Sequence, residues 1–217
     1  MCGIVSYIGK KDPVPILLKG LRRLEYRGYD SAGVALLNSE KLQSIKKVGK
    51  VSALESLIDD SPINGYCGIA HTRWATHGEP NDVNAHPHID KTKKIALVHN
   101  GIIENYDSIK EVLKKRGVSF TSSTDSEVLV QLISELYYNN NENLSFEDAV
   151  RAALQEVIGA YGIVVICEDE PGKIIAARMG SPLVLGVGEG EFLIASDASP
   201  IIAVSYTHLR AHETSLH

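Results

Sequence analysis

The sequence contains few cysteines, and they show no paired spacing. Cys2, Cys67 and Cys167 are the three among 217 residues, and they form neither a disulfide framework nor a metal-binding motif. Cys67 and Cys167 lie inside apolar segments, so we expect both to be buried strand residues. A chain without expected disulfides suits a reducing compartment, and we therefore expect a cytoplasmic location.

Long apolar runs and an excess of positive charge are also lacking. No run approaches the ~20 residues of a membrane-spanning helix, and Lys10, Lys11 and Asp12 interrupt the first apolar stretch too early for a signal peptide. The formal net charge is −5, which gives no electrostatic basis for binding nucleic acid or an anionic membrane. The hydrophobic content of 44% is ordinary for a globular chain of one large or two small domains.

Strand-like and helix-like segments alternate along the chain. Apolar residues recur at helical spacing in residues 13–24, 51–58, 105–116, 126–138 and 146–157. Short apolar runs predict strands at residues 4–8, 33–37, 42–48, 68–71, 95–99, 162–167, 173–177, 183–187 and 191–195. This order favours an α+β protein whose helices are segregated onto the outer faces of its sheets.

The last segment, residues 204–217, differs in character from the rest. It holds three of the eight histidines and has no clear apolar period. It resembles a translated sequencing adapter, so we expect a native domain at residues 1–203 followed by a non-native tail that does not dock.

Cys2 follows Met1 directly, which suggests an N-terminal nucleophile. Removal of Met1 would leave one residue carrying both a thiol and a free α-amine. An α-amine with a pKa of about 7.7–8.0 can accept a proton near neutral pH, so it can activate the thiol without a histidine base. The alternative is that Cys2 is a small apolar residue opening a buried strand.

Three further polar segments follow strands or begin a helix, and each has a structural alternative. Asn100-Gly101 is the commonest pair in a tight hairpin turn. Thr124 and Glu127 fit a capping box, with Asp125 at the positive end of the helix. The third segment, residues 71–80, includes two histidines, but the histidine spacing matches no common zinc pattern, so we expect no metal and no cofactor.

Together these segments resemble one family, the glutaminase (class II glutamine amidotransferase) domain of glutamine–fructose-6-phosphate aminotransferases. The motifs that carry the resemblance are Cys2-Gly3-Ile4-Val5, Glu25-Tyr26-Arg27-Gly28-Tyr29-Asp30, His71-Thr72-Arg73-Trp74-Ala75-Thr76-His77-Gly78, His86-Pro87-His88, His99-Asn100-Gly101 and Thr124-Asp125-Ser126-Glu127. The resemblance covers residues 1–203. It implies a four-layer αββα sandwich of the N-terminal-nucleophile hydrolase type.

The resemblance also implies a role for each candidate residue in hydrolysing L-glutamine to glutamate and ammonia. Cys2 would attack the side-chain amide, and Asn100 and Gly101 would stabilise the oxyanion. The substrate would be held by Arg73 at its α-carboxylate and by Asp125 at its α-ammonium. The residues expected to complete the pocket are Thr76 and His77 in its lining, Trp74 in a covering loop and Arg27 near the nucleophile.

In the family, two sugar isomerase domains follow the glutaminase domain and use the ammonia to convert fructose 6-phosphate into glucosamine 6-phosphate. We expect this chain to lack those domains, and the full-length enzyme to be a homo-oligomer. Two alternatives remain at this point: a glutamine-binding regulatory module without turnover, and the glutaminase domain of another class II amidotransferase.

Overall fold

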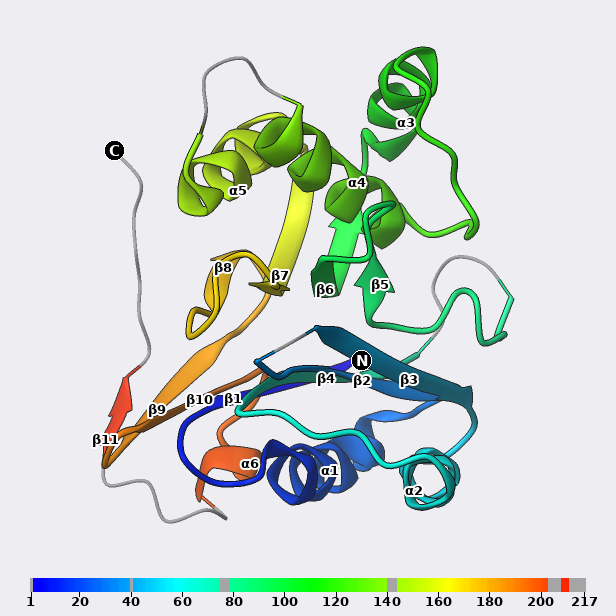
Figure 1. Ribbon diagram of the computed structural model, residues 1–217. Coiled ribbons are helices and arrows are strands. Elements are labelled where there is room, and N and C mark those ends of the chain that lie inside the picture. The colour runs from blue at the N-terminus through cyan, green and yellow to red at the C-terminus, as the bar shows by residue number, and fades with distance from the viewer. Residues whose placement is uncertain (1, 40, 75–78, 140–143, 203–207, 211–217) are drawn as a thin grey trace.

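Two antiparallel sheets lie face to face, and helices cover the outer face of each sheet (Figure 1). The computed structural model of the chain describes residues 2–39, 41–74, 79–139, 144–202 and 208–210. The order of layers is helices, sheet, sheet, helices, as Figure 1 shows from bottom to top. The predicted α+β class and the four-layer αββα sandwich are therefore confirmed.

The first sheet has seven strands in the order β11-β9-β10-β1-β4-β2-β3. Their bounds are β1 Gly3–Ile8, β2 Ser31–Leu37, β3 Leu42–Val48, β4 Cys67–Arg73, β9 Val184–Gly188, β10 Glu191–Ala195 and β11 His208–Arg210. The strand that begins just after Cys2 is central, because β1 pairs with β10 on one side and β4 on the other. This pairing sets Gly3 opposite Thr72, so the end of β4 lies beside Cys2.

The second sheet has four strands in the order β5-β6-β7-β8. Their bounds are β5 His88–Ile89, β6 Ile95–Ile103, β7 Gly159–Cys167 and β8 Ile175–Met179. β6 and β7 pair along their whole lengths, from Ile95 opposite Cys167 to Ile103 opposite Gly159. This long antiparallel pair fixes the positions of Asn100 and Gly101, and the Asn100 side chain faces the first sheet.

Helices α1 Pro13–Leu24, α2 Val51–Asp60 and α6 Ser199–Ile202, with the 3₁₀ turn Glu25–Arg27, cover the first sheet. Helices α4 Asp125–Tyr138 and α5 Phe146–Gln155 cover the second, and α3 Tyr106–Lys115 packs beside α4. α1 begins where the Asp12 carboxylate accepts a hydrogen bond from the Val14 N–H, at 3.0 Å. Proline is favoured at such a first turn because its missing N–H would have no partner there.

The hydrophobic core has three parts, one between the sheets and one under each helical layer. Ile4, Ile69, Val98 and Val164 lie between the sheets and are fully buried. Cys67 and Cys167 are also fully buried in their strands, which confirms the prediction made for them. Among the helices of the described residues, none is both long and apolar enough to cross a membrane.

The five predicted helices and nine predicted strands are all present, with boundaries that shift by a few residues. The short elements β5, α6 and the 3₁₀ turn were not predicted, because two to four residues carry no readable period. The expectation that residues 204–217 do not dock was wrong for His208–Arg210, whose backbone pairs with β9. Backbone pairing at a sheet edge needs no apolar stripe, so the side-chain pattern could not reveal it.

Candidate active site

The head of β1, the end of β4, the middle of β6 and the start of α4 surround one small pocket. Its lining consists of Cys2, Arg73, Trp74, His86, His99, Gly101, Thr124, Asp125 and Ser126. Five of the residues predicted from the sequence are among them. These segments are far apart in the chain, so the sandwich alone brings them together.

The Cys2 thiol lies against the backbone at the end of β4. The Trp74 N–H donates a hydrogen bond to Cys2 Sγ at 3.2 Å. Burial raises the pKa of the Cys2 thiol, while the Trp74 N–H is the largest of the effects that lower it. Because the net direction is upward, the thiol is protonated at neutral pH and needs a base before it can attack.

Asn100 and Gly101 lie in the middle of a strand, so the hairpin-turn alternative for this pair was wrong. Asn100 is opposite Gly162 and Gly101 is opposite Tyr161 in the β6–β7 pair. Gly101 has φ +134°, and a Cβ atom there would lie 2.0 Å from the Ala160 carbonyl oxygen. Only glycine fits this position. The requirement for glycine comes from close backbone approach inside the sheet and not from a turn.

The Asn100 side chain connects the two sheets beside the nucleophile. Its Nδ2 donates to the Cys2 carbonyl oxygen at 3.2 Å. Its Oδ1 lies 2.9 Å from His71 Nε2, which belongs to β4 of the other sheet. The amide nitrogen is therefore held beside Cys2, where an oxyanion donor is needed.

Arg73 and Asp125 supply opposite charges to the pocket. Arg73 is only 4% exposed, and its Nη1 lies 3.7 Å from Asp30 Oδ1. The Asp125 carboxylate accepts a hydrogen bond from the Ile103 N–H at 2.9 Å and lies 3.9 Å from His99 Nδ1. Burial lowers the pKa of His99, although the Asp125 charge opposes this effect. The Asp125 carboxylate and the Arg73 guanidinium thus belong to the lining of one pocket.

The capping-box prediction at α4 is half correct. Thr124 is the N-cap, and its Oγ1 accepts a hydrogen bond from the Glu127 N–H at 3.3 Å. The Glu127 carboxylate does not return to the Thr124 N–H. It accepts instead from the backbone N–H and hydroxyl groups of Thr121 and Ser122. Glu127 therefore stabilises the turn before the helix, and this turn places Asp125 at the pocket.

Trp74 and Arg27 lie at the edge of the site. Trp74 is 52% exposed, and its ring rests on Gly28, where a Cβ atom would lie 2.2 Å from Trp74 Cε3. Arg27 forms an ion pair with Asp197, and its guanidinium lies over the Tyr26 ring. Arg27 is not among the described residues that line the pocket.

Two predicted pocket residues, Thr76 and His77, lie outside the described residues. The sequence reasoning considered the histidines only as metal ligands, and it did not predict that three of them pack together at the pocket, where His86 is part of the lining. The His71 and His86 ring centroids are 4.1 Å apart, and those of His86 and His88 are 4.6 Å apart. Burial lowers the pKa of His71 to about 3 and lowers those of His86 and His88 well below the ordinary value.

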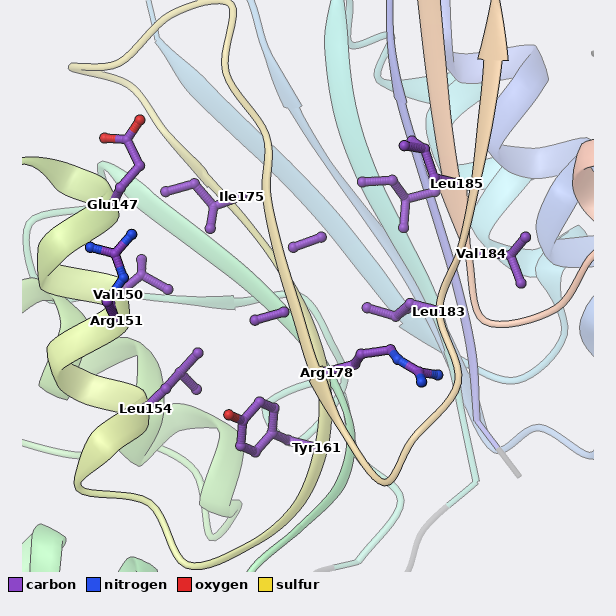
Figure 2. A pocket seen from close by; sticks show the side chains of 13 residues that line it. Glu147, Val150, Arg151, Leu154, Tyr161, Ile175, Arg178, Leu183, Val184 and Leu185 are labelled. Carbon is purple, nitrogen blue, oxygen red and sulfur yellow. The ribbon is translucent and has the colours of Figure 1, made fainter. Parts of the chain in front are cut away.

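A larger cavity of about 480 Å³ lies elsewhere, between α5 and the strands β7, β8 and β9. Figure 2 shows that apolar side chains face into it from both sides. They include Val150, Leu154, Tyr161, Leu183 and Leu185. Of the residues predicted for the active site, none that the structure describes lines this cavity.

The αββα sandwich with Cys2 at the head of a central strand places the fold in the N-terminal-nucleophile class. The family model described as a glutamine amidotransferase domain matches residues 71–203. The chain belongs to this family.

Similar proteins agree with this assignment. The chain is 59% identical over 203 residues to glutamine–fructose-6-phosphate aminotransferase (isomerizing) of Bacteroides thetaiotaomicron, covering 93% of this chain and 33% of that protein. It is 57% identical to the protein of the same name from Chlorobaculum tepidum, with the same two coverages. The chain thus spans about one third of the length of these relatives.

The fold is also shared with solved structures. A glutamine phosphoribosylpyrophosphate amidotransferase from B. subtilis superposes with a TM-score of 0.82 at 27% identity, covering 96% of this chain and 45% of that one. An allosteric regulatory enzyme of purine biosynthesis gives 0.83 at 28% identity, covering 96% and 44%. These two enzymes therefore share the fold of this chain although fewer than a third of their residues are identical to it.

Proposed function

We propose that this chain hydrolyses L-glutamine to glutamate and ammonia, with Cys2 as the nucleophile. The observation that carries the proposal is the position of Cys2, in one pocket with Arg73, Gly101 and Asp125 and bonded through its carbonyl to Asn100. A glutamine-binding module without turnover would need the two charged residues but would have no use for a thiol beside an amide donor.

The reaction begins with removal of Met1, which frees the Cys2 α-amine. The Cys2 sulfur attacks the side-chain amide carbon of glutamine, and the α-amine takes the thiol proton, directly or through a water molecule. A base is required because a thiol with an ordinary pKa of about 8.5 is mostly protonated at neutral pH, and burial raises the pKa of Cys2 further. The amine then returns the proton to the departing ammonia, and water hydrolyses the γ-glutamyl thioester to glutamate.

The tetrahedral oxyanion is stabilised by the Asn100 Nδ2–H and the Gly101 backbone N–H. Donors that are already in place cost no reorganisation when charge develops, which makes them effective in a site that excludes water. Asn100 meets this condition, since both ends of its amide are hydrogen-bonded within the protein.

Arg73 binds the substrate α-carboxylate and Asp125 binds the α-ammonium. A planar guanidinium offers two parallel charge-assisted bonds to a carboxylate. Thr76, His77 and the Trp74 loop complete this pocket, and Arg27 supports the nucleophile from its edge. The two opposite charges select an amino acid with a neutral side-chain amide over a simple amide.

We also propose that the chain is the glutaminase part of a longer, homo-oligomeric cytoplasmic enzyme that passes ammonia to fructose 6-phosphate. The names of the relatives and the one-third span of the match support the longer enzyme and its acceptor.

The test measures glutamate and ammonia release by the chain with Met1 removed, by the chain that retains Met1, and by Cys2→Ala. We expect release only from the chain whose Cys2 amine is free. Equal release by Cys2→Ala would refute the proposed nucleophile, and equal release with Met1 retained would refute the α-amine as base.

A further inference from the structure

We propose that His71 is a positioning residue that fixes the orientation of the Asn100 amide and so aims its N–H groups at the oxyanion. This inference rests on the proposed glutaminase function. It concerns a residue of β4 that does not line the pocket but touches a residue that acts there.

The proton on the His71 ring is located by its neighbours. His71 Nε2 lies 3.1 Å from the His99 carbonyl oxygen, which can only accept a hydrogen bond. The other ring nitrogen, Nδ1, is buried and has no hydrogen-bond partner among the described residues. Burial keeps the ring neutral by holding its pKa at about 3, so the ring carries a single proton. This proton lies on Nε2, where the His99 carbonyl oxygen and Asn100 Oδ1 can both accept it.

The Asn100 amide is then oriented from both ends. A donating His71 Nε2–H requires the oxygen Oδ1 on its side, at 2.9 Å. The Cys2 carbonyl, which can only accept, requires the nitrogen Nδ2 on the other side, at 3.2 Å. A flipped amide would set donor against donor at His71 and oxygen against oxygen at Cys2, so one orientation alone satisfies both contacts.

This orientation matters for the reaction. The Asn100 Nδ2 group carries two hydrogens, and the Cys2 carbonyl accepts one of them. The second is available for the oxygen that becomes negative when the Cys2 sulfur attacks. Without His71 the amide would lose one of its two constraints, and its oxygen could rotate toward the developing negative charge. A lone pair at that point would repel the oxyanion.

The competing explanation is that His71 only fills the core between the sheets, where it is fully buried and packs on His86. Replacing a purely structural residue would lower stability. It would not lower kcat by changing the orientation of the Asn100 amide. The two explanations therefore differ in how kcat responds per active molecule.

The experiment compares His71→Leu, His71→Gln and His71→Asn in the chain with Met1 removed. Glutamine places its amide nitrogen near the position of Nε2, whereas asparagine reaches only the position of Nδ1. Turnover is divided by the fraction of Cys2 that a diazo-ketone analogue of glutamine labels, so unfolded molecules are not counted. Tyr7→Phe is the control, because it removes a buried hydrogen bond to Glu191 at the opposite end of β1.

We expect His71→Leu and His71→Asn to lower kcat about 10–100-fold, the usual scale for partners that orient a reacting group. KM should stay unchanged, His71→Gln should recover most of the loss, and Tyr7→Phe should keep the original kcat. Normal kcat in both His71→Leu and His71→Asn would overturn the inference. If His71→Leu does not fold, His71→Gln is compared with His71→Asn. Equal kcat values for these two variants would overturn the inference.

A double-mutant cycle tests whether His71 acts through Asn100. In the Asn100→Ala background, adding His71→Leu should cause no further loss of kcat, because the amide that it orients is already gone. Losses that multiply would show that His71 acts independently, against the inference. If Cys2→Ala retains full turnover, the proposed function itself fails. If Cys2→Ala is inactive and Asn100→Ala has a strongly lowered kcat while His71→Leu is normal, only the role of His71 fails.

Discussion

At the scale of single residues, Asn100 carries the clearest prediction. Asn100→Ala should lower kcat about 10²–10³-fold, or roughly 2.7–4 kcal/mol, because it removes one preorganised oxyanion donor. Glutamine binding should persist. Steady-state kinetics of the folded variant would measure both quantities.

Asn105→Ala is a matched control for this substitution. Its amide bonds to backbone groups of Glu156 and Ile158, and Asn105 is not part of the pocket lining. It should reduce stability without changing turnover per folded molecule. If Asn100→Ala behaved in the same way as this control, Asn100 would have a structural role alone.

Arg73→Lys and Asp125→Asn should each raise the KM for glutamine strongly. Lysine is a point charge that cannot form the two parallel bonds of a guanidinium, and asparagine lacks the charge that attracts an ammonium. The amide oxygen introduced by Asp125→Asn could still accept from the Ile103 N–H, so the fold should survive. Initial rates over a range of glutamine concentrations would measure the effect.

The control for these two variants is Arg22→Lys, at an exposed arginine on α1 that is paired with Glu55. It should leave KM unaltered. A KM for glutamine that is the same in wild type, Arg73→Lys and Asp125→Asn would remove the substrate-binding assignment.

Single residues also show where sequence reasoning succeeds and fails. Cys2, Arg73 and Asp125 were predictable because their motifs resemble a family, and the structure sets them around one pocket. The hairpin alternative for Asn100-Gly101 failed because positive φ is also required where the β7 backbone approaches closely. The contact of His71 with Asn100 could not be found from the sequence, because the two residues belong to different sheets.

At the scale of elements, the start of α4 can be tested through its cap. Thr124→Ala should lower the free energy of unfolding by about 1 kcal/mol, the usual contribution of an N-cap hydroxyl. The loss should exceed this value somewhat, because Thr124 Oγ1 also bonds to His88 Nε2 at 3.0 Å. Urea denaturation would measure the difference.

Thr124→Ser keeps the hydroxyl and is the matched control, so its stability should stay close to that of wild type. Equal losses in Thr124→Ala and Thr124→Ser would show that the Thr124 methyl group matters and the cap does not.

The long elements were predictable from their periods, whereas the alternative bonding of Glu127 was not. A capping-box pattern does not say which of several nearby N–H groups the carboxylate will meet.

At the scale of the whole molecule, the buried histidines couple stability to pH. His71, His86 and His88 have lowered pKa values in the folded state because burial disfavours their charged forms. The unfolded chain binds protons at the ordinary histidine pKa of about 6.5, so it takes up more protons than the folded chain below that pH. These three histidines should therefore leave the free energy of unfolding unchanged above about pH 6.5. Below that pH they should lower it progressively as the pH falls.

The slope approaches about 1.4 kcal/mol per pH unit for each of these histidines. Denaturation at pH 7.5, 6.5 and 5.5 would reveal it, and a folded His88→Gln variant should show a shallower slope. Equal stability at pH 6.5 and 5.5 in the wild type would contradict the neutral, buried state of this cluster.

The fold class was predictable from the sequence, but the pairing of the strands was not. Family resemblance and the segregation of helices indicated the αββα sandwich, which the structure confirms. The position of β1 between β10 and β4 depends on contacts between segments that lie far apart in the chain. No local pattern encodes such contacts, and yet they place the Cys2 thiol beside the Trp74 N–H.

The most direct test of the account is the intact mass of the chain, with Met1 removed, after reaction with a diazo-ketone analogue of glutamine. We predict one adduct per molecule, located at Cys2 and accompanied by complete loss of glutaminase activity, with no adduct in Cys2→Ser. Cys67 and Cys167 are fully buried and should not react. An adduct on either of those cysteines, or glutaminase activity that survives labelling of Cys2, would contradict the N-terminal-nucleophile mechanism.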